Sequence, residues 1–219
     1  MISIQKMCES LSNKIEQELN LDVNQSAVVN YGLFAIIQTV VAILLEIILG
    51  ALLGVLIPTL ILSLVAVILR KYSGGVHAET PEECIVIGTV ISVGGALIVD
   101  WIPWKLTYIL VLLVIVFSMA YYLVWKFAPV DSAAKPIRRT EKKQLLKKRS
   151  ILVLSIYLVA CVATLLGYLN SNNDKFLVYI ACMCAGIGWQ VFTLTKIGHL
   201  AMGKIDLFFN KLLNNKGGN

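Results

Sequence analysis

The fold class is decided by residues 106–125, LTYILVLLVIVFSMAYYLVW, a stretch without a single charged side chain. A helix needs about 20 mostly apolar residues to cross the roughly 30 Å hydrocarbon core of a bilayer. Further charge-free runs occupy residues 27–45, 47–69, 84–99, 150–173 and 176–195. The pattern predicts an all-α, polytopic integral membrane protein with about six transmembrane helices. The run 84–99 is short and rich in glycine, so this third span either crosses the bilayer or is short or re-entrant.

The composition of the whole chain agrees with this prediction. Of the 219 residues, 58% are apolar and only 15% are charged, against about 45–50% and 25% in soluble domains. A soluble domain of this length has too little interior to hide so much apolar surface. Soluble enzymes, disordered proteins and nucleic-acid binders are therefore excluded, and the lipid bilayer is an expected partner.

The basic residues predict the orientation. Only Lys105 and Lys175, of 19 Lys and Arg residues, fall outside the terminal segments and the loops 70–83 and 126–149. Because cytoplasmic loops carry the excess of Lys and Arg, we expect both termini and these loops to be cytoplasmic.

The two ends of the chain are expected to form interfacial amphipathic helices. Apolar residues recur at helical spacing in residues 1–26, and no cleavable signal peptide is predicted there. Residues 205–213 have an apolar side made of Leu207, Phe208, Phe209, Leu212 and Leu213. The expected divisions are an N-terminal segment 1–26, a transmembrane domain 27–199 and a C-terminal helix and tail 200–219.

The first two runs are nearly continuous around residues 46–54, so a very tight turn is expected there, with Glu46 near it. A charge inside a membrane segment is costly unless it reaches water or a polar partner. Glu46 is therefore either a carboxylate at the outer interface or a buried partner of a polar group on another helix.

The densest polar segment flanked by membrane runs from residue 70 to residue 84, RKYSGGVHAETPEEC. Thr80, Pro81 and Glu83 predict a capped helix start, so Cys84 would lie in the first turn. On one continuous helix His77 and Cys84 would be about 10 Å apart, too far for proton transfer. Gly74 and Gly75 permit a turn that folds back over the helix start.

Cys84 and His77 are thus candidates for an activated nucleophile and its base. Helix N-termini and a neighbouring imidazolium both favour a thiolate, and such a pair performs acyl transfer. Backbone N–H groups of Gly74, Gly75 or the helix start could form an oxyanion hole. The alternative is an ordinary loop histidine and a small apolar cysteine. The spacing of Cys182 and Cys184 suits neither a metal nor a redox site, and no cofactor is expected.

The loop 126–149 holds 9 basic residues against Asp131 and Glu141. It is either a topology signal or a landing site for an acidic peptide, drawn in by the summed field. Its second half, residues 138–149, could form a helix along the lipid headgroups.

Two motifs together resemble the AgrB family, the accessory gene regulator B membrane endopeptidases of peptide quorum sensing. They are RKYSGGVHA at residues 70–78 with Cys84 seven residues after His77, and FAPVD at residues 127–131 running into KPI at residues 135–137. The resemblance implies a cysteine endopeptidase of the bacterial cell membrane with His77 and Cys84 as catalytic residues. It also implies a homodimer and, as the substrate, an AgrD-like precursor peptide cut on the cytoplasmic side.

The resemblance further implies an acyl-thioester on Cys84 that an internal Cys or Ser of the peptide attacks, which releases a thiolactone or lactone ring. Substrate-binding residues are then expected at Arg70, Gly74, Gly75, Lys135, Arg138, Arg139, Lys142 and Lys143. Two other hypotheses are a peptide exporter without covalent catalysis, which would tolerate Cys84→Ser, and a cysteine-dependent lipid acyltransferase, which would be indifferent to an acidic tail.

Overall fold

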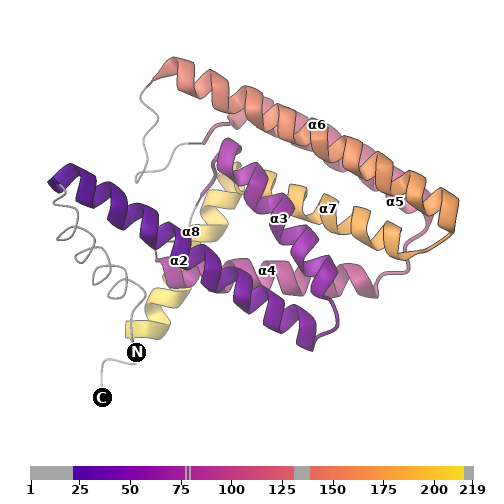
Figure 1. Cartoon of the computed structure of the whole chain (residues 1–219), viewed down its shortest axis with the longest axis horizontal. Helices are drawn as coiled ribbons and strands as arrows, with labels where there is room; N and C mark the ends of the chain where they lie inside the picture. The colour runs from indigo at the N-terminus through magenta and orange to yellow at the C-terminus, as the bar shows by residue number, and fades with distance from the viewer. Residues whose placement is uncertain (1–21, 77, 79, 131–138, 215–219) are drawn as a thin grey trace.

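The structure, a computed structural model, describes residues 22–76, 78, 80–130 and 139–214. Its regular secondary structure in these ranges is helical throughout (Figure 1), which confirms the predicted all-α class. The amphipathic helix expected in the N-terminal segment lies almost wholly outside the described residues. The seven described helices are α2 (Val23–Leu52), α3 (Leu56–Ser73), α4 (Pro81–Trp101), α5 (Leu106–Phe127), α6 (Thr140–Ser171), α7 (Lys175–Phe192) and α8 (Lys196–Asn214).

Five of these helices, α3 to α7, are long and apolar enough to cross a membrane. In α2 the apolar part is the shorter stretch Ile36–Leu52, which covers the end of the first predicted run and the beginning of the second. Helix α4 is continuous over 21 residues despite its glycines, so the third run has the length of a full span. Side chains such as Val114 and Val159 are more than two-thirds exposed, as expected for surfaces that face lipid. The protein is a multi-pass membrane protein.

Helix α7 lies in the middle of the bundle, where it packs against α3, α4, α5 and α6 (Figure 1). Its residues Ile180, Ile187 and Val191 are fully buried. Helix α2 covers α3 and α4 on the other side of the bundle. A polar bond also joins the layers, because the Tyr157 hydroxyl on α6 donates to the Val65 carbonyl on α3 at 3.0 Å. The central position of α7 matters for the site, since the end of α7 meets the loop between α3 and α4.

The first turn lies further along the chain than Glu46. Helix α2 continues through Glu46 to Leu52, and the reversal uses Gly54 with φ 74°. Glu46 is only 5% exposed, and its carboxyl lies within hydrogen-bonding reach of Ser63 on α3 and Ser92 on α4. The interfacial interpretation of Glu46 is therefore wrong, and the buried one is confirmed. Glutamate is a good helix former, so a charge in the sequence did not have to end the helix.

Two further helices differ from the expected limits. The basic residues of the loop's second half, from Lys142 onward, belong to α6 itself. This helix runs unbroken for 32 residues and so measures about 48 Å. They extend a spanning helix beyond a roughly 30 Å core instead of forming a separate helix along the headgroups. Helix α8 begins at Lys196, nine residues before the expected start at residue 205. Its Leu207 and Phe208 are more than 60% exposed.

Candidate active site

Cys84 lies in the first turn of α4, as predicted from the capping pattern. The Thr80 side chain accepts from the Glu83 N–H at 3.3 Å, and the Glu83 carboxylate accepts from the Thr80 N–H at 3.2 Å. Pro81 occupies the start of the helix. The Cys84 thiol is free and partly buried. The capping box therefore fixes the direction in which the helix leaves the loop, and with it the position of the thiol.

The loop before α4 begins with the glycine turn. The Gly74 N–H donates to the Arg70 carbonyl at 2.9 Å and closes α3, so in this structure that N–H is occupied. Gly74 has φ 69° and Gly75 has φ 136°, conformations that L-residues with side chains seldom adopt. A side chain at Gly74 would collide with the Val130 carbonyl, and one at Gly75 would meet the Thr193 hydroxyl. Both positions thus require glycine for conformation and for space.

The end of α7 anchors this loop through two polar residues that the sequence interpretation missed. The Gln190 Nε2 donates to the Ser73 hydroxyl at 3.0 Å and to the Gly74 carbonyl at 2.7 Å. The Val76 N–H donates to the Thr193 carbonyl at 3.2 Å. Gln190 and Thr193 are fully buried. A glutamine and a threonine near the end of an otherwise apolar run are the only sequence signal for this role.

The segment after α5 lies against the same loop. The Val130 N–H donates to the Ser73 carbonyl at 2.9 Å, and Gly74 and Val130 form an isolated parallel bridge. The two sequence motifs that carry the family resemblance therefore meet in space, although Gly74 and Val130 are 56 positions apart in the chain.

Two charged side chains act on the Cys84 thiol. Arg70, near the end of α3, donates to the Val76 carbonyl, and its positive charge acts on Cys84. Asp206, on α8, is only 6% exposed, and its negative charge acts on Cys84 too. The Arg70 Nε is buried and has no hydrogen-bond partner among the described residues. Asp206 was not predicted from the sequence.

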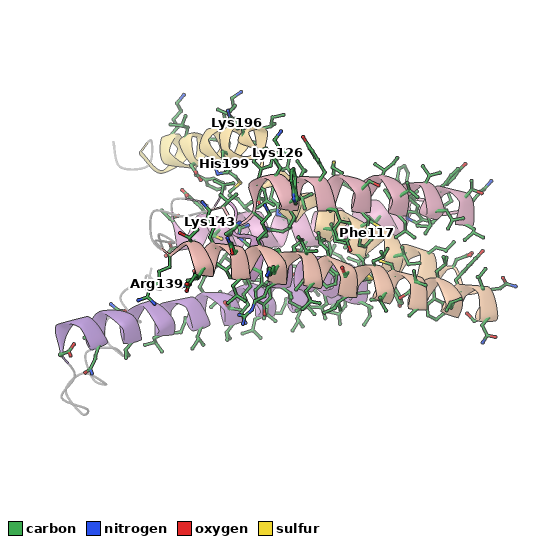
Figure 2. The ribbon with its side chains drawn as sticks, turned by 90° about the horizontal axis from the view of Figure 1, so that it is seen from above. Phe117, Lys126, Arg139, Lys143, Lys196 and His199 are labelled. Carbon is green, nitrogen blue, oxygen red and sulfur yellow. The ribbon has the colours of Figure 1, made fainter. Side chains whose placement is uncertain are left out.

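Of the predicted site residues, Arg70, Gly74, Gly75 and Cys84 come together around this loop. His77, Lys135 and Arg138 lie outside the described residues, although both neighbours of His77 in the chain are described. Arg139, Lys142 and Lys143 are exposed at the start of α6. Figure 2 shows Lys126, Arg139, Lys143 and Lys196 at one end of the molecule, the end where α3 finishes and α4 begins in Figure 1.

Three other cysteines are packed in the apolar core. Cys161, Cys182 and Cys184 are at most 1% exposed, and the Cys161 Sγ lies 3.8 Å from the Met183 Sδ. Among the cysteines that the structure describes, only Cys84 is both partly accessible and next to charged groups.

The fold and the site define a class: multi-pass helical membrane proteins with a thiol at the capped start of a spanning helix, beside a partly buried arginine. The comparison with protein families identifies the family within this class. The family model of accessory gene regulator B matches residues 8–194, and the chain belongs to the AgrB family.

Curated relatives agree with this assignment over nearly the whole chain. An AgrB-like protein 2 of Clostridium perfringens (strain 13 / Type A) is 37% identical over 213 residues, which cover 96% of this chain and all of the relative. An AgrB-like protein of Clostridium perfringens (strain SM101 / Type A) is 35% identical over 213 residues, which again cover 96% of this chain and all of the relative. No solved structure matches the chain significantly. The family processes AgrD-like peptides in Agr quorum sensing, and its members are generally membrane peptidases.

Proposed function

We propose that this protein is a membrane-embedded cysteine endopeptidase that removes the C-terminal tail of an AgrD-like precursor peptide. Cys84 is the nucleophile and His77 is the general base. The observation that carries the proposal is the position of Cys84, partly accessible in the first turn of α4, where the positive charge of Arg70 offsets part of the cost of burying a thiolate. A helix start and a nearby cation both favour a thiolate, whereas burial opposes it.

The reaction begins when His77 takes the proton of the Cys84 thiol. The sulfur attacks the scissile carbonyl and forms a C–S bond. The C–N bond then breaks, and His77 returns the proton to the amine of the departing tail. An acyl-thioester remains on Cys84. An internal thiol or hydroxyl of the peptide attacks this thioester, closes a thiolactone or lactone ring, and gives its proton back to the Cys84 sulfur.

The surroundings of Cys84 suit a peptide substrate. The available Nε–H of Arg70 can donate to a peptide carbonyl or to the oxyanion that forms on it, and backbone of the Gly74–Gly75 turn lies along the same loop. Arg139, Lys142 and Lys143 are exposed in the first turns of α6, where they can attract an acidic tail together with Lys135 and Arg138. Holding the thioester and the internal nucleophile in one site favours ring closure over hydrolysis.

The positive charge at this end of the bundle supports a cytoplasmic location of the site. Both termini would then lie on the cytoplasmic side of a bacterial cell membrane. The homodimer implied by the family resemblance belongs to the same proposal.

Intact-protein mass spectrometry on the full chain in liposomes tests the proposal. An acidic-tailed precursor peptide is added to the wild type, to Cys84→Ala and Cys84→Ser, and to Cys161→Ala as a control that removes a remote, buried thiol. We expect a thioester-linked peptide adduct that maps to Cys84 in the wild type and in Cys161→Ala. It should be absent from both Cys84 variants and reduced in His77→Ala.

Cleavage that persists in Cys84→Ala would overturn the nucleophile assignment. Transport of intact peptide by Cys84→Ser at the wild-type rate, without any adduct in the wild type, would favour an exporter instead. Acyl transfer from a lipid donor that ignores the peptide tail would favour the acyltransferase hypothesis.

A further inference from the structure

A carboxyl group lies deep in the bundle, together with hydroxyls from two other helices. Glu46 on α2 is 5% exposed, and its carboxyl is within hydrogen-bonding reach of Ser63 on α3 and Ser92 on α4. Helix α2 packs across both partner helices (Figure 1). Ser63 and Ser92 are each at least about 10 Å from either end of their helices, at 1.5 Å per residue. These three residues, the intramembrane cluster, are thus far from water on either side of the membrane.

The polar face of α3 continues beyond the intramembrane cluster. Thr59 precedes Ser63 by four residues, so both lie on one face of the helix. A Cβ atom at Gly50 of α2 would lie 3.3 Å from the Thr59 Oγ1. Because Gly50 follows Glu46 by four residues, the Thr59 hydroxyl lies against α2 one turn from the carboxyl group.

The Thr59 hydroxyl and a second one, that of Thr89, lack partners. Thr89 is three residues before Ser92 on α4; it is 6% exposed, and Thr59 is fully buried. Neither Oγ1 has a hydrogen-bond partner, and no other buried hydroxyl in the described part of the chain lacks one. Helical hydroxyls commonly donate to the carbonyl four residues back, as Ser150 and Thr164 do at 2.9 and 2.8 Å. A buried hydroxyl without a partner is costly, so these two oxygens point to a bound species.

Glu46 also lacks a basic side chain to pair with in the surrounding segments. Lys, Arg and His are absent from residues 15–69, 78–104 and 176–195 of the sequence, which hold most of the four helices α2, α3, α4 and α7. An ionised carboxylate in an apolar interior needs a compensating charge. That charge comes either from a bound cation or from a proton on the carboxyl group itself.

The composition of the cluster selects between the possible ions. Hard cations prefer oxygen ligands, and all the polar atoms gathered here are oxygens. One carboxylate neutralises one monovalent cation, whereas a divalent ion would leave an excess charge in the apolar interior. The described residues contain no group of three or more His, Cys, Asp or Glu side chains of the kind that holds transition metals or Ca²⁺. A proton would neutralise Glu46 but would leave the two threonine oxygens without a partner.

We propose that the intramembrane cluster binds a small monovalent cation such as Na⁺, which clamps α2 onto α3 and α4. The Glu46 carboxylate and the hydroxyls of Ser63 and Ser92 are the ligands, and the hydroxyls of Thr59 and Thr89 are the further oxygens within one turn. The proposal does not depend on the peptidase function, because none of these residues belongs to the candidate active site.

Thermal unfolding of the purified full chain in a neutral detergent tests the proposal, with NaCl or choline chloride at equal ionic strength. For the wild type we expect a saturable rise of the midpoint, by about 5 °C when Na⁺ is about 100-fold above its Kd. Glu46→Gln should lose this rise. In choline chloride it should unfold no lower than the wild type, because it carries no uncompensated charge. Asp100→Asn, which removes an exposed carboxylate from α4, is the matched control and should keep the rise.

The hydroxyl ligands are tested by small substitutions, which also decide the matter if Glu46→Gln does not fold. Thr59→Val keeps the shape of the side chain and should raise the Kd for Na⁺ about 10-fold, as should Ser92→Ala. Thr164→Val is the matched control, because that hydroxyl is already bonded to the Ala160 carbonyl. It should leave the Kd for Na⁺ unchanged.

Equal midpoints of the wild type in the two salts would overturn the proposal and would indicate a protonated Glu46 instead. A rise with Na⁺ that persists in Glu46→Gln would also overturn it, since it would show an adventitious ion only. Unchanged Na⁺ affinity in both Thr59→Val and Ser92→Ala would have the same meaning. No peptide is present in these measurements, so a failure of the proposed peptidase function would leave their outcome untouched.

Discussion

Two groups of buried polar side chains lie in this apolar bundle, and they bind different kinds of atoms. The loop cluster is Ser73, Gln190 and Thr193. The Gln190 amide donates to the Gly74 carbonyl, and the main-chain carbonyl of Thr193 accepts from the Val76 N–H, so both bond to backbone atoms of the segment that leads to His77. The intramembrane cluster, Glu46, Ser63 and Ser92, joins side chains of α2, α3 and α4. The first therefore fixes the course of a loop, whereas the second holds three helices together.

The difference has a physical consequence. A side-chain hydrogen bond between membrane helices contributes about 0.6 kcal/mol on average, so its loss should mainly lower stability. A bond to loop backbone decides where the proposed catalytic groups lie, and a displacement of about 1 Å can cost about 100-fold in rate. Mutations in the loop cluster should affect catalysis, and mutations in the intramembrane cluster should affect the free energy of unfolding.

The largest effect is expected for Gly75→Ala. The new methyl group would lie 2.5 Å from the Thr193 Oγ1, at a φ of 136° that alanine avoids, so the loop must move away from α7. We expect adduct formation on Cys84 to fall about 100-fold. Gly188→Ala is the matched control, because a methyl group there meets nothing within 4 Å. Wild-type adduct formation by Gly75→Ala would show that the loop position does not limit catalysis.

A smaller effect is expected for Gln190→Met, which keeps the approximate size of the side chain but removes both donors to the loop. The Ser73 hydroxyl and the Gly74 carbonyl each lose this partner, while the hydroxyl still donates to the Leu69 carbonyl, and each lost hydrogen bond costs about 0.5–1.5 kcal/mol. The rate of adduct formation should fall about 10-fold, with a lower midpoint of thermal unfolding. Gln144→Met, exposed on α6, should change neither quantity. A lower midpoint with an unchanged rate would place Gln190 with the stabilising residues instead.

Gly75 and Gln190 also show which features could be predicted from the sequence and which could not. The capped start of α4 was predictable, because Thr80 and Glu83 act on neighbouring backbone within one turn. The glycine turn was predictable for the same reason. Gln190, more than 100 residues from the loop it binds, was not, because its role depends on how α7 packs. The burial of Asp206 was also not predictable, since the apolar pattern of α8 gave no sign that the helix buries its carboxylate.

The charge pattern of the sequence also predicted some features and not others. The excess of basic residues in certain loops predicted which end of the bundle is positive, since topology depends on local counts. Glu46 was harder, because one charge in an apolar run has the same local sequence whether it reaches water or a partner. Only the packing of α2 on α3 and α4 decides between the two.

The exposed start of α6 belongs to neither cluster, so it should affect peptide capture alone. We expect Lys142→Gln combined with Lys143→Gln to raise the KM for an acidic-tailed peptide about 3-fold with kcat unchanged, because the attraction is screened and long-ranged. The difference should disappear at about 1 M salt, where the Debye length is about 3 Å. Lys105→Gln combined with Lys175→Gln, on the oppositely placed loops, is the control. A change in kcat would mean that these lysines touch the reacting groups.

The smallest effect on activity is expected for Glu46→Gln. Glutamine has nearly the same shape and can still hydrogen-bond to Ser63 and Ser92, so adduct formation should stay within about 2-fold of the wild type. Glu46→Leu leaves two buried hydroxyls without that partner and should lower the free energy of unfolding by about 1–3 kcal/mol, again with activity kept at low temperature. Thermal unfolding in detergent and adduct formation in liposomes, measured on the same preparations, separate the two quantities. If Glu46→Gln lost activity as strongly as Gly75→Ala while keeping its unfolding midpoint, the intramembrane cluster would have a function of its own. The exporter hypothesis, which needs a charge inside the bundle, would then gain its first specific support.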